Sequence, residues 1–228
     1  MDPSSNSALL SDYRAIIGSL LYTAVMTRPD IAYATCMLSR CMTRPTPKLL
    51  EAAEWVLAYL YHHRHCGLTF EAEPSDLRGY SDSDWAVQHS TSGWVLQWQS
   101  ACISWGSQKQ RTIALSSCEA EIVALSEAAK DTLYFRKILE ELGVPHAGAT
   151  RLATDNKAAH DLSYNPEHHK RTEHVDRRHF FIRECVEDMK ITVPLVKTTD
   201  NLADFFTKPL PAKTFYNMRN AIMNIRSN

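Results

Sequence analysis

The pattern of secondary-structure signals changes once along this chain, and that change limits the folds it can adopt. The first third has only helical spacing of apolar residues, interrupted by TRPD at 27–30 and ending near Gly67. After a linker at 71–76, three short β-branched or aromatic segments at 77–82, 92–98 and 101–105 predict a meander of strands. An all-helical segment therefore precedes a part that contains a sheet.

Strand and helix signals alternate in the rest of the chain. A capping box at Ser116 and Glu119 opens a long helix that Gly143 and Pro145 close. A strand is expected at 151–154 and another at 191–196, with helices starting at Asp155 and spanning 171–189 and 201–208. Three hairpin-joined strands followed by strand–helix alternation predict an α/β fold, a mixed five-stranded sheet flanked by helices. Residues 1–10 are expected to be a loose leader and residues 211–228 a C-terminal tail.

Composition excludes several classes of protein. The formal net charge is −1 over 228 residues, so any affinity for nucleic acid must come from local basic patches. The six cysteines have no paired spacing, which favours reduced thiols. No signal peptide and no apolar run as long as a membrane span is visible. An intracellular protein without disulfides or a membrane partner is expected.

Four carboxylates in separate parts of the chain are the main candidates for chemistry: Asp82 in GYSDSDW, Glu121 in CEAEIVALSEA, Asp155 in LATDNKAA and Asp204 in NLADFFTKPL. Each lies where a strand ends or on a predicted helix. Carboxylates without a nearby Cys or His pattern are typical ligands of hard divalent cations such as Mg²⁺. Two such cations side by side catalyse phosphodiester hydrolysis.

Each acid also has an ordinary structural role available. Asp82 fits a turn at a strand end, and Asp155 fits the N-cap of the following helix. Glu121 fits a solvated helical position, although the capping box already uses Glu119 and leaves Glu121 without a capping task.

Asp204 also has both an ordinary structural role and a functional role available. Lys208 follows it by one turn, so an ordinary surface pair would explain it. Asp200 is the expected N-cap of the last helix, which leaves Asp204 available for other work.

Several motifs in order connect these positions to a known family: GYSDSDWA, TSGWVLQW, ISWGSQKQ, ALSSCEAEIVALSEAAKD, ATDNKAA, HKRTEHVDRRHFFIRE and NLADFFTKPL. Over roughly residues 77–210 the chain resembles the ribonuclease H domain of copia-type long-terminal-repeat retrotransposon Pol polyproteins. Residues 11–70 resemble the thumb-like C-terminal end of the reverse transcriptase in that family.

The resemblance implies a function and a site. Asp82, Glu121, Asp155 and Asp204 would be the catalytic and metal-binding set, holding two Mg²⁺ ions, with Mn²⁺ as a substitute. The reaction would be endonucleolytic hydrolysis of the RNA strand in an RNA–DNA hybrid. Partners would be the hybrid and the rest of the reverse transcriptase, in a cytoplasmic retroelement particle and in the nucleus. The paired-Asp motif of a polymerase is absent, so no DNA synthesis is expected.

Two questions stay open at the level of sequence. The basic residues Lys109, Arg111, Lys170 and Arg171 are candidates for nucleic-acid contact, and ordinary solvated loop charge is their alternative. The alternative for the whole chain is an inactive or domesticated element fragment that binds nucleic acid or packs on a polymerase without cutting.

Overall fold

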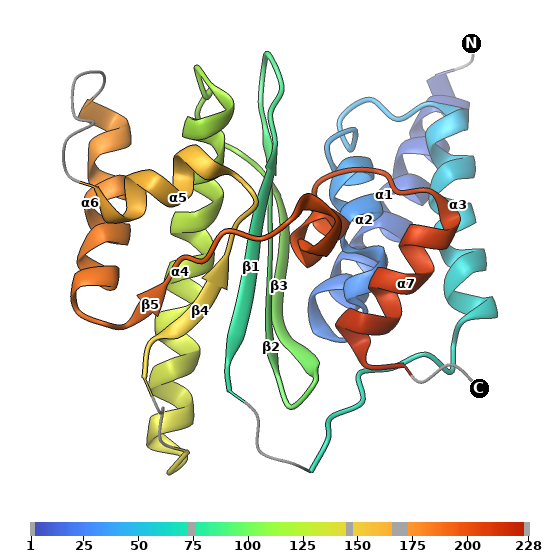
Figure 1. The fold of residues 1–228 in the computed structure, drawn as a ribbon. Coiled ribbons are helices and arrows are strands. Elements are labelled where there is room, and N and C mark those ends of the chain that lie inside the picture. Colours follow the sequence, from blue (N-terminus) through green and yellow to red (C-terminus); the bar gives the residue numbers. More distant parts are fainter. Residues whose placement is uncertain (1–2, 73–75, 145–147, 166–172, 226–228) are drawn as a thin grey trace.

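A five-stranded sheet with the strand order β3-β2-β1-β4-β5 forms the centre of the protein (Figure 1). The computed structural model describes residues 3–72, 76–144, 148–165 and 173–225. The strands are β1 (Arg78–Asp84), β2 (Thr91–Trp98), β3 (Ala101–Lys109), β4 (Thr150–Ala153) and β5 (Ile191–Thr192). β1, β2 and β3 form an antiparallel meander, whereas β4 pairs in parallel with β1, and β5 with β4. The predicted mixed five-stranded sheet is confirmed.

Helices cover both faces of the sheet (Figure 1). On one face lie α4 (Ser117–Glu141), α5 (Lys157–Tyr164) and α6 (Glu173–Glu187). On the other lie α1 (Pro3–Met26), α2 (Ala32–Ser39), α3 (Pro47–His62) and α7 (Ala212–Met223). The short 3₁₀ turn η1 (Pro29–Ile31) joins α1 to α2, and η2 (Thr198–Asp200) and η3 (Leu202–Phe206) follow one another between β5 and α7. The predicted all-helical segment before the sheet is also confirmed.

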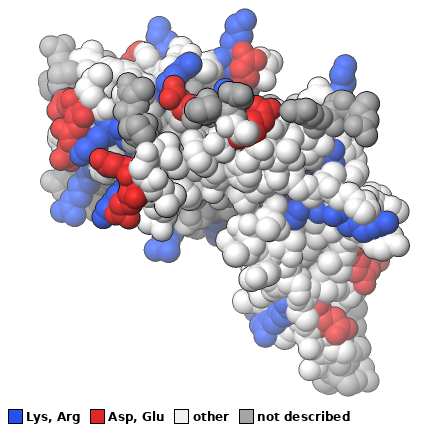
Figure 2. Space-filling model, turned by 90° about the horizontal axis from the view of Figure 1, so that it is seen from below, with Lys and Arg blue, Asp and Glu red and all other residues white. Residues whose placement is uncertain are grey.

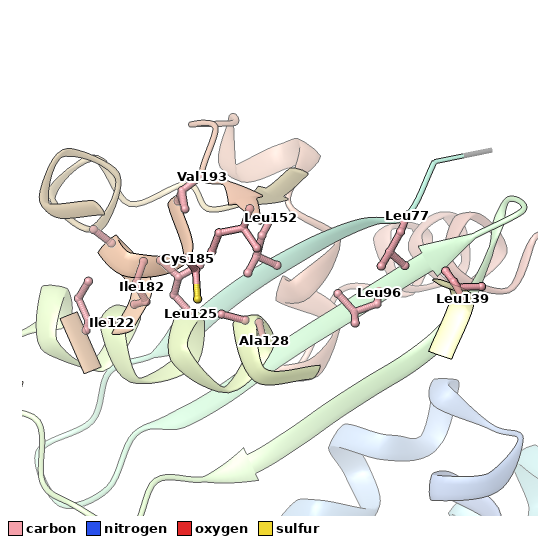
Figure 3. Packing of buried hydrophobic residues seen from close by; sticks show 13 residues of the cluster. Leu77, Leu96, Ile122, Leu125, Ala128, Leu139, Leu152, Ile182, Cys185 and Val193 are labelled. Carbon is pink, nitrogen blue, oxygen red and sulfur yellow. The ribbon is translucent and has the colours of Figure 1, made fainter. Parts of the chain in front are cut away.

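The main hydrophobic core lies between the sheet and α4 to α6 (Figure 3). Leu96 of β2 and Leu152 of β4 are fully buried there with Leu125 of α4 and Ile182 of α6. Burying each such side chain contributes about 1.5–3 kcal/mol. A second cluster on the opposite face includes Phe206 of η3, so both faces of the sheet are covered.

Local capping signals in the sequence appear as expected. Ser116 accepts a hydrogen bond from the Glu119 amide, and Glu119 in turn accepts one from the Leu115 amide, which starts α4. Gly143 has φ +78°, the left-handed conformation that ends helices and that glycine adopts without strain. These contacts span few residues, which is why they could be predicted.

The structure corrects the predictions for the two chain ends. The expected loose leader at 1–10 is wrong for its described part, because α1 already begins at Pro3. The expected tail at 211–228 contains α7, whose Met218, Ile222 and Met223 are buried. Gln97 of β2 donates a hydrogen bond to the Ala221 carbonyl, so α7 is attached to the sheet.

Two predicted elements are shorter than expected. The strand at 191–196 is regular only at Ile191–Thr192, since Pro194 has no N–H to donate, and an isolated bridge joins Thr154 and Leu195 farther on. The helix at 201–208 is the 3₁₀ turn η3, because Pro209 disfavours helical geometry in the residue before it.

The surface of the protein is uneven in charge. Seen from below, basic and acidic side chains are mixed on the left and along the upper edge of the view, and a broad area in the middle holds few of them (Figure 2). No helix in the described residues is long and apolar enough to cross a membrane. All six cysteines are described and free.

Candidate metal-binding site

Asp82 lies on the central strand β1 and is 4% exposed. Its cross-strand partner on β2 is Gly93, which has no side chain to hold other elements away. A Cβ at Gly93 would lie 2.6 Å from Thr207 Cγ2 and 2.9 Å from the Ala203 carbonyl oxygen. The glycine therefore allows the segment around η3 to pack directly on the strand, where the Thr207 hydroxyl donates a hydrogen bond to Asp82 Oδ2.

Glu121 comes from the first turns of α4 and is also buried, at 5% exposed. Its Oε1 accepts a hydrogen bond from the Ser83 backbone amide at 3.1 Å, which fixes the side chain beside the end of β1. Among the described residues, Glu121 Oε2 has no hydrogen-bond partner. Glu119 is half-buried and its carboxylate serves the start of the helix, so the geometry agrees with the choice of Glu121 over Glu119.

Asp155 follows β4 and is half-buried. It is not the N-cap of α5, because Asn156 accepts the capping bond from the Ala159 amide. The side-chain amide of Asn201 donates to Asp155 Oδ1 at 3.1 Å and to the Ser81 carbonyl at 3.0 Å.

Asn201, and not the expected Asp200, caps the last turn, since its Oδ1 accepts from the Ala203 amide. The Asn201 side chain therefore both caps the start of η3 and holds the carboxylate of Asp155, which follows β4. Sequence reasoning assigned this residue no role, although its position three residues before Asp204 is a capping signal that Asn satisfies as well as Asp does.

Asp204 lies in η3 and is 5% exposed, so it is not an ordinary surface acid. The predicted pair with Lys208 does form, with Lys208 Nζ 2.9 Å from Asp204 Oδ1. The charge of Asp204 also acts on Asp82, whose pKa it helps to raise.

The carboxylates of Asp82, Glu121 and Asp155 form a compact group. Each offers one oxygen, and these three oxygens lie within 4.8 Å of one another. Burial raises the pKa of Asp82 to about 7, with the charges of Asp204 and Asp155 acting in the same direction and Thr207 and Lys208 opposing them. Burial and the charge of Asp82 raise the pKa of Glu121 to about 8. Burial likewise raises the pKa of Asp204, against the opposing effect of Lys208.

This arrangement fits a hard divalent cation. A buried carboxylate oxygen without a hydrogen-bond partner costs free energy. A hard divalent cation, which binds six or more oxygen ligands, would provide that oxygen with a partner. The positive charge of a bound cation would also favour the ionised form of the carboxylates, which burial disfavours. Three carboxylates from β1, α4 and the end of β4, with Asp204 beside them, offer oxygen ligands alone, the ligand type that Mg²⁺ and Mn²⁺ prefer.

The predicted basic contact residues are only partly brought together. A cavity of about 420 Å³ lies at the far end of β1, and a second of about 290 Å³ lies beside Ser92, which pairs with Ser83 next to Asp82. The second is lined by Arg111 together with Lys130 of α4 and Arg178 of α6, two residues that the sequence did not suggest. Lys109 ends β3 without lining this cavity. Lys170 and Arg171 lie outside the described residues.

The chain is similar in sequence to parts of longer transposon proteins of plants. No protein-family model matches the chain. It is 37% identical over 207 residues to the retrovirus-related Pol polyprotein from transposon TNT 1-94 of Nicotiana tabacum, covering 89% of this chain and 16% of that protein. It is 36% identical over 217 residues to the corresponding polyprotein from transposon RE1 of Arabidopsis thaliana, covering 93% and 15%. The chain thus spans less than a fifth of the length of these relatives.

A likeness also extends to solved structures. The N-terminal RNase H domain of Rv2228c from Mycobacterium tuberculosis superposes with a TM-score of 0.45 at 12% identity, covering 64% of this chain and 97% of that one.

Proposed function

Because this chain belongs to the copia-type Pol polyproteins of transposons, we propose that it is a metal-dependent endoribonuclease acting on the RNA strand of RNA–DNA hybrids during reverse transcription. The observation that carries the proposal is the meeting of four acids from four separate elements at one end of the sheet. Three of them, Asp82, Glu121 and Asp204, are almost fully buried. Stability alone gives no reason to collect buried carboxylates in this way.

The four acids would act as cation ligands with distinct positions. Asp82 is grouped with Glu121 and Asp155, and the charge of Asp204 also acts on it, so Asp82 would be the carboxylate able to serve both cations. Two Mg²⁺ ions, or Mn²⁺ in their place, would supply an activated water and stabilise the charge on the scissile phosphate and the leaving oxygen. Thr207 and Asn201 are the positioning residues, because they hold Asp82 and Asp155 in place.

Contacts to the hybrid would come from the basic cavity beside the acids. Arg111 lines it from the loop after β3, Lys130 from α4 and Arg178 from α6. A phosphate backbone is the polyanion that such a surface attracts. Lys130 also pairs with Glu127 at 3.0 Å, so part of its charge is offset. Preference for RNA would rest on contacts to 2′-hydroxyl groups across the shallow minor groove.

The helical segment suggests where the rest of the polyprotein would pack. Several large apolar side chains on α1 and α3 are well exposed: Tyr22, Val25, Met26, Trp55 and Tyr61. An exposed apolar surface of this kind is typical of an interface. We propose that residues 11–70 are a thumb-like remnant that contacts the polymerase, and that residues 77–210 are the nuclease domain.

The test is cleavage of labelled substrates by the purified chain. We expect an RNA–DNA hybrid to be cut in Mg²⁺ and left intact in chelator, and duplex RNA and duplex DNA to be left intact in both. Asp82→Asn should abolish cleavage, whereas Asp84→Asn, at an exposed position on the same strand, should not. Binding of the hybrid without cleavage by the unaltered chain would favour the alternative, an inactive or domesticated binding module.

A further inference from the structure

One of the four acids already has a cation beside it, supplied by the protein itself. Lys208 Nζ lies 2.9 Å from Asp204 Oδ1, and the side chains are 37% and 7% exposed, respectively. The charges of Asp82 and Asp155 also act on this lysine. The ammonium group therefore lies on the Asp204 side of the acid cluster.

The other side of the cluster is different. Asp82, Glu121 and Asp155 hold three oxygens within 4.8 Å of one another. Within the described part of the chain, none of these three forms an ion pair with a lysine or arginine. The site is thus open to a cation at the three-carboxylate side and blocked by an ammonium at Asp204.

We propose that Lys208 takes the place of the second divalent cation in the metal-free protein and must leave Asp204 before that cation can bind. The inference rests on the proposed function, because it assumes that the cluster is a two-cation site. Its consequence is ordered loading. The first cation binds the group of Asp82, Glu121 and Asp155 without competition, and the second binds at Asp204 only in competition with Lys208.

The surroundings of the two residues make this exchange physically reasonable. Asp204 is fixed in the buried turn η3, whereas the Lys208 side chain is partly exposed and has a flexible four-carbon stem. Thr207, which directly precedes Lys208 on the chain, stays bonded to Asp82, so the backbone need not move for the lysine to swing out. A divalent cation and an ammonium cannot share one carboxylate oxygen at contact distance without strong repulsion.

Manganese binding followed by electron paramagnetic resonance tests the proposal, because it counts free and bound Mn²⁺ without any substrate. For the unaltered chain we expect two classes of site, the second weaker. Lys208→Met keeps the length of the side chain and removes its charge, and should tighten the second class by about tenfold while leaving the first nearly unchanged. Lys208→Arg keeps the charge and should retain the weak second class.

Lys213→Met, at an exposed position on α7, is the control for loss of a surface charge and should change neither class. An unchanged or weaker second class in Lys208→Met, with the first class intact, would overturn this inference alone. Absence of both classes in the unaltered chain would overturn the two-cation site, and with it the proposed function as well. Circular dichroism of each variant separates these results from a failure to fold.

Discussion

Asn201 Nδ2 lies 3.1 Å from Asp155 Oδ1 and donates a hydrogen bond to it across 46 residues of sequence. The same amide binds the Ser81 carbonyl on β1, and the side-chain oxygen caps η3. Two strands and a turn are thus joined at the point where the acids meet. These hydrogen bonds of the Asn201 side chain explain how the carboxylates at this edge of the sheet are held in a fixed arrangement.

Replacing Asn201 should damage both stability and metal binding. Asn201→Ala removes an N-cap and leaves a buried carbonyl without its donor, so we expect a loss of about 2–3 kcal/mol in the free energy of unfolding. Urea denaturation measures this loss, and Mn²⁺ titration should show weaker binding. Thr46→Ala removes the N-cap of α3, far along the chain from the acids, and should cost about 1 kcal/mol without changing metal affinity. Equal metal affinity in Asn201→Ala and the unaltered chain would contradict the positioning role.

Stability in chelator should fall as pH rises through the neutral range. The pKa values of Asp82 and Glu121 are raised to about 7 and about 8, so the folded protein holds protons that the unfolded chain has lost. The free-energy cost of ionising these two buried carboxyl groups in the folded protein is absent below the ordinary carboxyl pKa. This cost grows as the pH rises above that value and reaches its full size above about pH 8. Mg²⁺ should relieve it, so the rise in Tm on adding Mg²⁺ should be larger at about pH 8.5 than at about pH 6. A Tm rise that is the same at both pH values would contradict this account.

Asp82→Asn should stabilise the metal-free protein while it abolishes activity. The substitution removes a buried charge and keeps the shape of the side chain, and the expected gain at about pH 8 is on the order of 2 kcal/mol. The Tm response to Mg²⁺ should disappear at the same time. Asp84→Asn provides the comparison, because Asp84 is exposed on the same strand and should leave the stability and the response unchanged. A destabilised Asp82→Asn in chelator would argue against electrostatic strain in the cluster.

Gly93→Ala should disturb the site through packing alone. Its Cβ would meet Thr207, Phe206 and the Ala203 carbonyl at 2.6–2.9 Å, so η3 must shift away from β2. We expect a loss of about 1–3 kcal/mol and weaker metal binding, because Thr207 moves relative to Asp82. Gly18→Ala is the matched control, since a Cβ there meets nothing within 4 Å on helix α1. That change should stabilise the protein by about 0.5–1 kcal/mol.

The basic cavity should contribute to hybrid affinity through charge. Arg111→Ala and Arg178→Ala should each weaken binding of an RNA–DNA hybrid and lower the slope of log K against log salt by about 1. Binding to catalytically inactive Asp82→Asn protein in chelator, at several salt concentrations, measures both quantities. Lys48→Ala, at an exposed position on α3, should leave the slope unchanged. An unaltered slope in both arginine variants would place the nucleic-acid surface elsewhere.

Local signals predicted most of the secondary structure and part of the site. The choice of Glu121 over Glu119 followed from a capping box, which involves atoms only a few residues apart. The predicted helix at 201–208 was wrong in type, and the strand at 191–196 was too long, because a proline within or just after each segment outweighed its apolar pattern. The cap was assigned to Asp200 when the neighbouring Asn201 makes it.

By itself, the sequence determined which acids were available, the order of elements that carry them and the family to which the chain belongs. Only the tertiary structure decided that Asn201 holds Asp155, that Thr207 holds Asp82 and that Arg178 approaches Arg111. The reason is physical. Capping and periodicity depend on contacts within a few residues, whereas Thr207 and Asp82 are 125 residues apart, and their contact depends on how closely η3 packs on the strand beside Gly93.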